Sequence, residues 1–168
     1  MATLKWGAII VALLSAGGCL HWSLPSHDVV RIVNTEVKRG AGAGSSGADP
    51  AAADVRYITA VGAEGEPHVY RNEDTDWGWP PYFKFDSADL AATAQEAAST
   101  KETPEWVVVT HYGWRIPVFS LFPNAVSIEP ATGPEASVTP WFNGVVLGLL
   151  ALLALFLWLR IRRWRAHA

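Results

Sequence analysis

The stretch Asp54–Arg71, DVRYITAVGAEGEPHVYR, carries the clearest β-sheet pattern in the chain. Its first part alternates between two faces, as side chains do along a strand: Val55, Tyr57 and Thr59 on one side, and Arg56, Ile58 and Ala60 on the other. Gly62–Glu66 supplies turn residues, and Pro67–Arg71 returns as a second extended run. This pattern predicts a β-hairpin.

Further short strands are expected on both sides of the hairpin, because β-branched and aromatic residues cluster there between turn signals. They are Asp28–Val37, Tyr82–Phe85, Trp106–Tyr112, which we take as the central strand, Val118–Phe122 and Ala125–Ile128. Two connections have little to bury: RGAGAGSSGADPAAA at 39–53 is expected to be a flexible loop, and PATGPEASVTP at 130–140 a linker.

One helix is predicted within the domain, beginning at Asp86 in DSADLAATAQEAAST. The Asp86 carboxylate is expected to accept a hydrogen bond from the amide of Asp89. Leu90, Ala94 and Ala97 would form the apolar stripe of this helix. The expected fold class is therefore α+β and β-rich, a small twisted sheet or partly open barrel with one helix.

The C-terminal region contains an uncharged run, Trp141–Leu159, WFNGVVLGLLALLALFLWL. A membrane-spanning helix needs about 20 apolar residues, which this run supplies. A basic tail follows at 160–168, with Arg160, Arg162, Arg163 and Arg165. We therefore predict a transmembrane helix with a cytoplasmic tail that favours anionic lipids of the inner leaflet.

The N-terminal region is apolar at 6–22, after a short segment at 1–5 that contains Lys5. Three interpretations stay open: an uncleaved transmembrane helix or signal anchor, a cleaved signal peptide, or a lipoprotein signal that ends at Cys19. All three place residues 23–140 across the membrane. The uncleaved helix predicts a two-pass protein with both termini in the cytoplasm, flanking a domain at 23–140.

The charge distribution excludes one class of partner. The chain has 13 Lys and Arg and 16 Asp and Glu. All of the acidic residues lie within 23–140, so the central domain is strongly acidic. An acidic domain argues against nucleic acid as a partner. Since Cys19 is the single cysteine, the domain has no internal disulfide.

The candidate site is the stretch Arg71–Ser87, RNEDTDWGWPPYFKFDS, together with THYGWR at 110–115. We expect Trp77 and Trp79 to fold over the sheet, and Arg115 to pair with an acidic residue of the stretch or to stack on an indole. A contact surface for a partner is the alternative. The candidate residues are Glu73, Asp74, Asp76, Trp77, Trp79, Tyr82, His111, Tyr112, Trp114 and Arg115.

The sequence gives less support to other chemical roles for these residues. Asn72, Asp74 and Asp76 have the alternate spacing of a calcium loop, but Trp77 and Phe83 stand where an EF-hand needs Gly and Glu, so only an irregular ion site stays open. The acids beside aromatic walls are also compatible with sugar cleavage. Zinc would require sheet pairing to bring His68 and His111 together. No Gly-x-Ser-x-Gly nucleophile motif is present, and no cofactor is predicted.

Five segments resemble the domain of unknown function 1523 family of small bacterial proteins. They are HDVVRI at 27–32, DVRYI at 54–58, VYRNEDTDWGWPPYFKFDSADL at 69–90, VVTHYGWR at 108–115 and FPNAVSIEP at 122–130. The resemblance implies an apolar helix on each side of the domain and a Gram-negative inner membrane, with the domain in the periplasm. It implies no activity and transfers no catalytic residues.

We therefore expect a non-enzymatic accessory, assembly or interaction subunit that docks on another membrane or envelope protein. A binding module for a divalent cation or a sugar is the alternative, and a periplasmic hydrolase is third.

Overall fold

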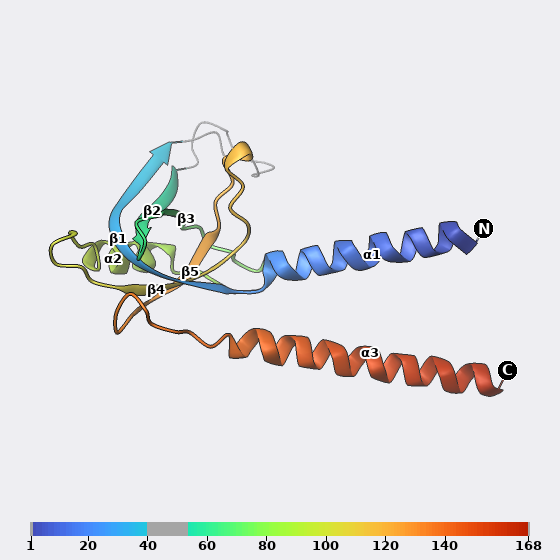
Figure 1. Ribbon diagram of the computed structural model, residues 1–168. Helices are drawn as coiled ribbons and strands as arrows, with labels where there is room; N and C mark the ends of the chain where they lie inside the picture. The colour runs from blue at the N-terminus through green and yellow to red at the C-terminus, as the bar shows by residue number, and fades with distance from the viewer. Residues whose placement is uncertain (1, 40–53, 168) are drawn as a thin grey trace. The chain divides into compact units, whose positions relative to one another are not determined.

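A computed structural model describes residues 2–39 and 54–167 (Figure 1). The chain divides into two compact units, Met1–Ser137 and Val138–Ala168. The elements in chain order are α1 (Ala2–Ser23), β1 (Ser26–Arg39), β2 (Asp54–Gly62), β3 (Pro67–Arg71), α2 (Ser87–Glu96), β4 (Val107–Tyr112), the 3₁₀ helix η1 (Pro117–Phe119), β5 (Asn124–Pro130) and α3 (Trp141–His167). Most of the expected flexible loop, residues 40–53, lies outside the described residues.

The strands form a closed barrel in the order β1-β2-β3-β5-β4, and β4 pairs back onto β1. The long strand β1 makes closure possible, because Ser26–Val30 pairs with β4 and Val30–Arg39 pairs with β2. A register shift between Ile32 and Asn34 divides the second of these ladders. Such bulges bend a strand and increase its twist, as barrel closure requires.

The pairing of β3 with β5 is parallel and is made at Arg71 and Asn124, whereas the other pairings are antiparallel. A five-stranded barrel of this order, with a helix between β3 and β4, has the topology of the OB-fold. The expected α+β class is confirmed, and the barrel is closed rather than partly open.

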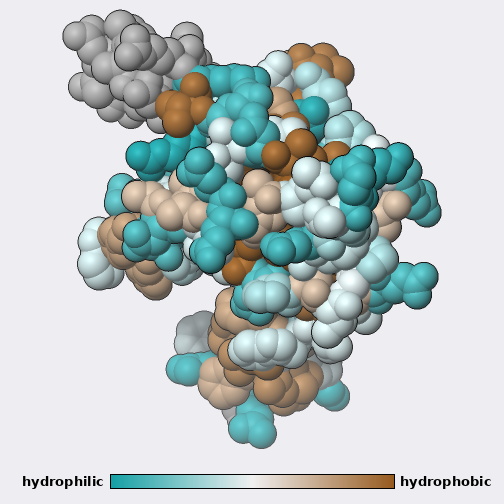
Figure 2. Space-filling view, turned by 90° about the vertical axis from the view of Figure 1, so that its left-hand side faces the viewer, coloured by the Kyte–Doolittle hydropathy of each residue, from teal (hydrophilic) through white to brown (hydrophobic). Residues whose placement is uncertain are grey.

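The core lies inside the barrel and beneath α2. Leu90 and Ala94 of α2 are buried and Ala97 packs against the same cluster, so the predicted stripe is confirmed. The largest fully buried side chains are Tyr70, Ile32, Ile58, Val30, Val109 and Pro80. One outer face of the barrel is mostly hydrophilic, with apolar residues in small separate groups (Figure 2).

Two predicted strands are not formed. Tyr82–Phe85 is irregular, because Pro81 has no amide to donate and Phe83 has a φ of 51°, which interrupts an extended chain. Val118–Phe122 is also not a strand: Pro117 opens η1, and the left-handed Ser120 (φ 51°) ends it.

The predicted cap of α2 is also different. The Asp86 side chain makes no capping hydrogen bond. Asp74 instead accepts from the amide of Ser87, at 2.8 Å, and from its hydroxyl, also at 2.8 Å. An acid 13 residues earlier therefore stabilises the start of the helix.

The two terminal helices differ in apolar length. Within α3, Trp141–Arg165 is long and apolar enough to cross a membrane. The apolar part of α1, Ile9–Ser23, is shorter, and α3 is the one helix among the described residues that meets the length and composition of a membrane span.

Candidate functional site

The stretch Trp77–Phe85 is folded with its charged side chain inside and most of its aromatic rings outside. Lys84 is only 4% exposed, whereas Trp77 is 82% exposed and Trp79 67% exposed. Phe83 and Phe85 are also more than half exposed. The expectation that the two tryptophans cover the sheet is therefore wrong. We call Trp77, Trp79, Phe83 and Phe85 the aromatic surface.

Lys84 lies inside because its ammonium group finds acceptors there. Its Nζ donates to Asn72 Oδ1 at 2.6 Å and to the carbonyl of Ala125 at 2.7 Å. Burial lowers the pKa of Lys84 from 10.5 to about 8, although the nearby charges of Asp86, Asp74 and Glu73 act to raise it. Side-chain hydrogen bonds in the interior thus decide which way this stretch faces.

The loop that carries the aromatic surface is closed by backbone contacts. The amides of Thr75 and Asp76 donate to the carbonyl of Lys84, at 3.0 and 3.2 Å. In return, the Lys84 amide donates to Thr75 Oγ1 at 3.0 Å. Phe83 is held at a positive φ, which is unusual for a bulky residue and requires support from the surroundings.

Within the aromatic surface, Trp77 packs against two other rings. The Trp77 ring lies 5.5 Å from that of Phe83 and 5.7 Å from that of Phe85, centroid to centroid, both edge-on. Edge-on packing is the favourable arrangement for such pairs. Trp77, Phe83 and Phe85 therefore form an ordered group of rings, and Trp79 lies on the same loop.

The acidic residues of the stretch do not converge on one point. Glu73 pairs with Arg71, and Asp74 binds Ser87. Asn72 is engaged by Lys84, and Asp76 is exposed at the edge of the loop. Within residues 2–39 and 54–167, no group of three or more His, Cys, Asp or Glu side chains is arranged to hold a metal ion.

Arg115 does not supply the cation for these acids. Its guanidinium lies 4.2 Å from the centre of the Phe122 ring, and Nη1 donates to the carbonyl of Leu121 at 3.4 Å. Arg71 pairs with Glu73 instead, because it stands two residues before Glu73 at the end of β3. The expected ion pair between Arg115 and an acid of the stretch is therefore not formed. The stacking expected on an indole occurs instead on the phenyl ring of Phe122.

The two predicted clusters meet at the C-terminal end of α1, which we call the helix junction. Tyr82 stacks on Tyr112 at 4.9 Å and donates its hydroxyl to the carbonyl of Ser23 at 2.7 Å. Trp22 packs edge-on against Tyr112 at 5.5 Å. Burial raises the pKa of both tyrosines, so both hydroxyls are neutral at physiological pH. Tyr82 donates to Ser23, whereas the Tyr112 hydroxyl accepts from Asn124 Nδ2 at 3.1 Å.

The chain segment after β4 completes the helix junction. The amide of Gly113 donates to the carbonyl of Trp22 at 2.9 Å, and Trp114 Nε1 donates to His21 Nδ1 at 2.8 Å. Gly113 has a φ of 93°, and a β-carbon there would lie 3.6 Å from Pro123 and Trp22. The 3.6 Å separations would be ordinary contacts, so it is the positive φ that favours glycine at this position.

A small cleft opens beside the helix junction. Its volume is about 170 Å³, below the range typical of small-molecule sites. The cleft is lined by aromatic residues of the helix junction and by polar residues of the barrel, including Trp22, Tyr112, Trp114, Arg71, Glu73 and Asn124.

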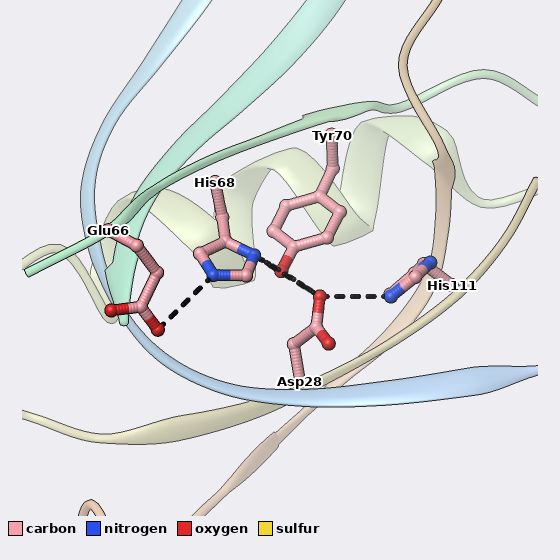
Figure 3. A network of polar contacts seen from close by, with 5 residues as sticks. All are labelled: Asp28, Glu66, His68, Tyr70 and His111. Atoms are coloured by element: carbon pink, nitrogen blue, oxygen red, sulfur yellow. Dashed lines mark hydrogen bonds and ion pairs between the residues drawn. The ribbon is translucent and has the colours of Figure 1, made fainter. Parts of the chain in front are cut away.

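A second polar cluster is centred on Asp28 (Figure 3). Its Oδ2 accepts from the Tyr70 hydroxyl at 2.7 Å and lies 2.9 Å from His111 Nε2 and 3.3 Å from His68 Nδ1. Glu66 Oε1 lies 3.6 Å from the other nitrogen of His68. The structure therefore does bring His68 and His111 together, on a carboxylate that sequence reasoning did not select.

The Asp28 cluster joins strands that are distant in the sequence. Burial acts to raise the pKa of Asp28, but hydrogen bonds from His111 and Tyr70, with the charges of the two histidines, outweigh it and lower the pKa from 3.8 to about 2. Burial and the Asp28 charge raise the pKa of Tyr70. The cluster links β1 to β3 and β4 through an ionised acceptor.

These features define a small closed-barrel domain joined to apolar helices, with an exposed aromatic surface beside a helix junction. The chain belongs to the family described as "Protein of unknown function (DUF1523)", whose model matches residues 3–165. It is 37% identical over 168 residues to an uncharacterized protein of Haemophilus influenzae, covering 95% of this chain and 94% of that protein. No solved structure matches the chain. The resemblance seen in the sequence is confirmed.

Proposed function

We propose that this protein is a membrane-anchored docking module, a non-enzymatic subunit that binds another membrane or envelope protein through the aromatic surface. The observation that carries the proposal is the inverted stretch, in which Lys84 is buried and four aromatic rings are exposed. Ordered exposed apolar groups are typical of interaction sites, and tryptophan is enriched at the residues that dominate binding.

The four exposed rings offer a large apolar area that a partner can bury. An aromatic ring buries about 150–250 Å² when covered, which at about 25 cal/mol per Å² corresponds to several kcal/mol. Leaving four rings in water forgoes this stabilisation. The closed loop around Thr75 and Lys84 holds the rings in place, so the conformational entropy lost on binding is small.

Charge indicates the chemistry of the partner. Asp76 and Asp86 are exposed on the segment that carries the rings. Glu73 and Asp74 also reach solvent, but Glu73 pairs with Arg71 and Asp74 accepts hydrogen bonds from Ser87. A complementary partner surface has an apolar pocket with basic residues at its rim. This combination favours a protein partner over an anionic lipid surface or nucleic acid.

We also propose a location for the protein, in the inner membrane. The positive flanks of both apolar helices favour cytoplasmic termini. In a two-pass protein of the inner membrane, α1 and α3 cross the bilayer, the barrel lies in the periplasm, and the arginine tail binds anionic inner-leaflet lipids. The length of α3 supports this arrangement, and α1 is continuous from Ala2 to Ser23.

Site-specific photocrosslinking tests the docking. A photoreactive phenylalanine analogue in place of Trp77 is expected to form one crosslinked product in native membranes. The same analogue in place of Thr93, on an exposed face of α2, is expected to form none. The double variant Trp79→Ala/Phe83→Ala should weaken the product at least tenfold, while Val37→Ala, at another exposed apolar position, should not. Equal patterns at positions 77 and 93 would contradict the proposal.

A further inference from the structure

The loop between β4 and β5, residues 113–123, has a composition unlike the rest of the domain. Its sequence GWRIPVFSLFP contains no acidic residue and a single cation, Arg115. Apolar side chains at its tip are exposed, with Val118 at 87%, Phe119 at 72% and Leu121 at 42%. In a domain that is otherwise strongly acidic, this loop is an apolar projection with one positive charge.

The loop has a defined structure. Ile116 and Leu121 are paired by two backbone hydrogen bonds, both of 3.1 Å. Between them, Pro117–Phe119 forms η1, and Arg115 folds back over Phe122. Val118 and Phe119 are therefore presented outward by a closed turn.

The base of the loop is attached to α1 through the helix junction. Gly113 binds the carbonyl of Trp22, and Trp114 binds His21. A β-carbon at Gly18, one turn earlier in α1, would lie 3.8 Å from the Trp114 ring. The loop thus emerges from the barrel where the last turns of α1 meet it (Figure 1).

We propose that the loop between β4 and β5 inserts Val118 and Phe119 into the surface of the bilayer that α1 enters. The inference rests on the proposed membrane anchoring of α1. Its partner is lipid rather than protein for a reason of charge: the aromatic surface is flanked by Asp76 and Asp86, which anionic lipids repel, whereas this loop has Arg115 as its single charge, which they attract. Exposed apolar side chains next to a membrane helix gain free energy by entering the interface.

Depth-dependent fluorescence quenching tests the proposal. In a full-length Cys19→Ser background, single cysteines are introduced by Val118→Cys in the loop, Ala63→Cys in the exposed turn between β2 and β3, and Leu13→Cys in α1. Each is labelled with an environment-sensitive fluorophore and reconstituted into vesicles of phosphatidylethanolamine and phosphatidylglycerol. The spin-labelled quencher is placed at shallow or deep positions on the lipid chain.

The label at 118 is expected to shift to the blue and to be quenched by the shallow lipid at least twice as strongly as the label at 63. Quenching at 13 but an aqueous spectrum at 118 would overturn the inference while leaving the anchor intact. An aqueous spectrum at 13 would overturn the anchoring by α1 and the inference with it. Neither outcome bears on docking by the aromatic surface, because residues 77–85 are unchanged.

Discussion

Lys84 shows how a single buried charge sets the orientation of the segment that carries the aromatic surface. Because its pKa falls from 10.5 to about 8 on folding, the unfolded chain binds more protons than the folded one between these values. The free energy of unfolding should therefore rise with pH in this window. Above about pH 10 the opposite effect begins, because the raised pKa values of the buried tyrosines make the unfolded chain ionise first.

We expect the free energy of unfolding to rise by about 1–2 kcal/mol between pH 8 and 10, on a scale of about 1.4 kcal/mol per pKa unit. The variant Lys84→Met should lose this rise, since it has no proton to release. The exposed Lys101→Met is the matched control and should behave as wild type. Chemical unfolding of the full-length protein in mild detergent, followed by near-ultraviolet circular dichroism, measures the effect. A rise that persists in Lys84→Met would show that another group is responsible.

Asp28 is expected to make the stability of the protein depend on pH in the acidic range. Its pKa is lowered from 3.8 to about 2 in the folded protein, so its contribution to stability is complete above pH 4 and is lost as the pH falls toward 2. Asp28→Asn should cost about 1–3 kcal/mol at pH 7, because Tyr70 and His111 lose a charged acceptor. Asp89→Asn, at an exposed position, should cost less than about 0.5 kcal/mol. Equal losses in the two variants would contradict a central role for Asp28.

At the scale of residues, the sequence predicted which segments form the candidate site. It did not predict which of their side chains are buried and which are exposed. Trp77 looked like a core residue because large aromatic side chains are usually covered. The acceptors that draw Lys84 inward are Asn72 and the carbonyl of Ala125, 12 and 41 residues away. No local pattern contains that information. Asp28 was missed because an acid at the start of a strand carries no signal until β3 and β4 bring their partners to it.

At the scale of elements, regular periodicity in the sequence was sufficient to predict helices and strands. It did not predict the segments whose backbone is irregular. The hairpin of β2 and β3 followed from alternation, and α2 from its Leu90–Ala94 stripe. Two short apolar runs, 82–85 and 118–122, have strand-like composition but lie in loops with residues of positive φ. Closure of the barrel depends on the pairing of β1 with β4, about 80 residues apart, and of β3 with β5, neither of which a single sequence displays.

The helix α2 supplies a test of core packing. Leu90 is 7% exposed and packs with Ala94 into the barrel cluster. Leu90→Ala should lower the free energy of unfolding by about 2–4 kcal/mol, through lost burial and the cavity left behind. Thr93→Ala on the exposed face is the control and should change it by less than about 1 kcal/mol. A loss below 1 kcal/mol in Leu90→Ala, measured by denaturant unfolding, would mean that α2 is not a packed part of the domain.

At the scale of the molecule, the helix junction attaches two different loops of the barrel to the end of α1. Tyr82 belongs to the loop that carries the aromatic surface, yet its hydroxyl binds Ser23 at the end of α1. Trp114 opens the loop between β4 and β5, yet it binds His21 of the same helix. A helix that enters a membrane would therefore position both loops at the bilayer surface, one for a protein partner and one for lipid.

This arrangement requires the barrel and the arginine tail to lie on opposite sides of the membrane. In the full-length Cys19→Ser protein, a cysteine introduced by Ala63→Cys should react with a membrane-impermeant maleimide added to cells whose outer membrane is permeabilised. A cysteine introduced by Trp164→Cys, in the tail, should react only after the inner membrane is disrupted, because the proposed topology puts the end of α3 in the cytoplasm. Reaction at 164 with protection at 63 would reverse the orientation. Reaction at both positions before disruption would mean that α3 does not separate them, and the two-pass topology would then be wrong.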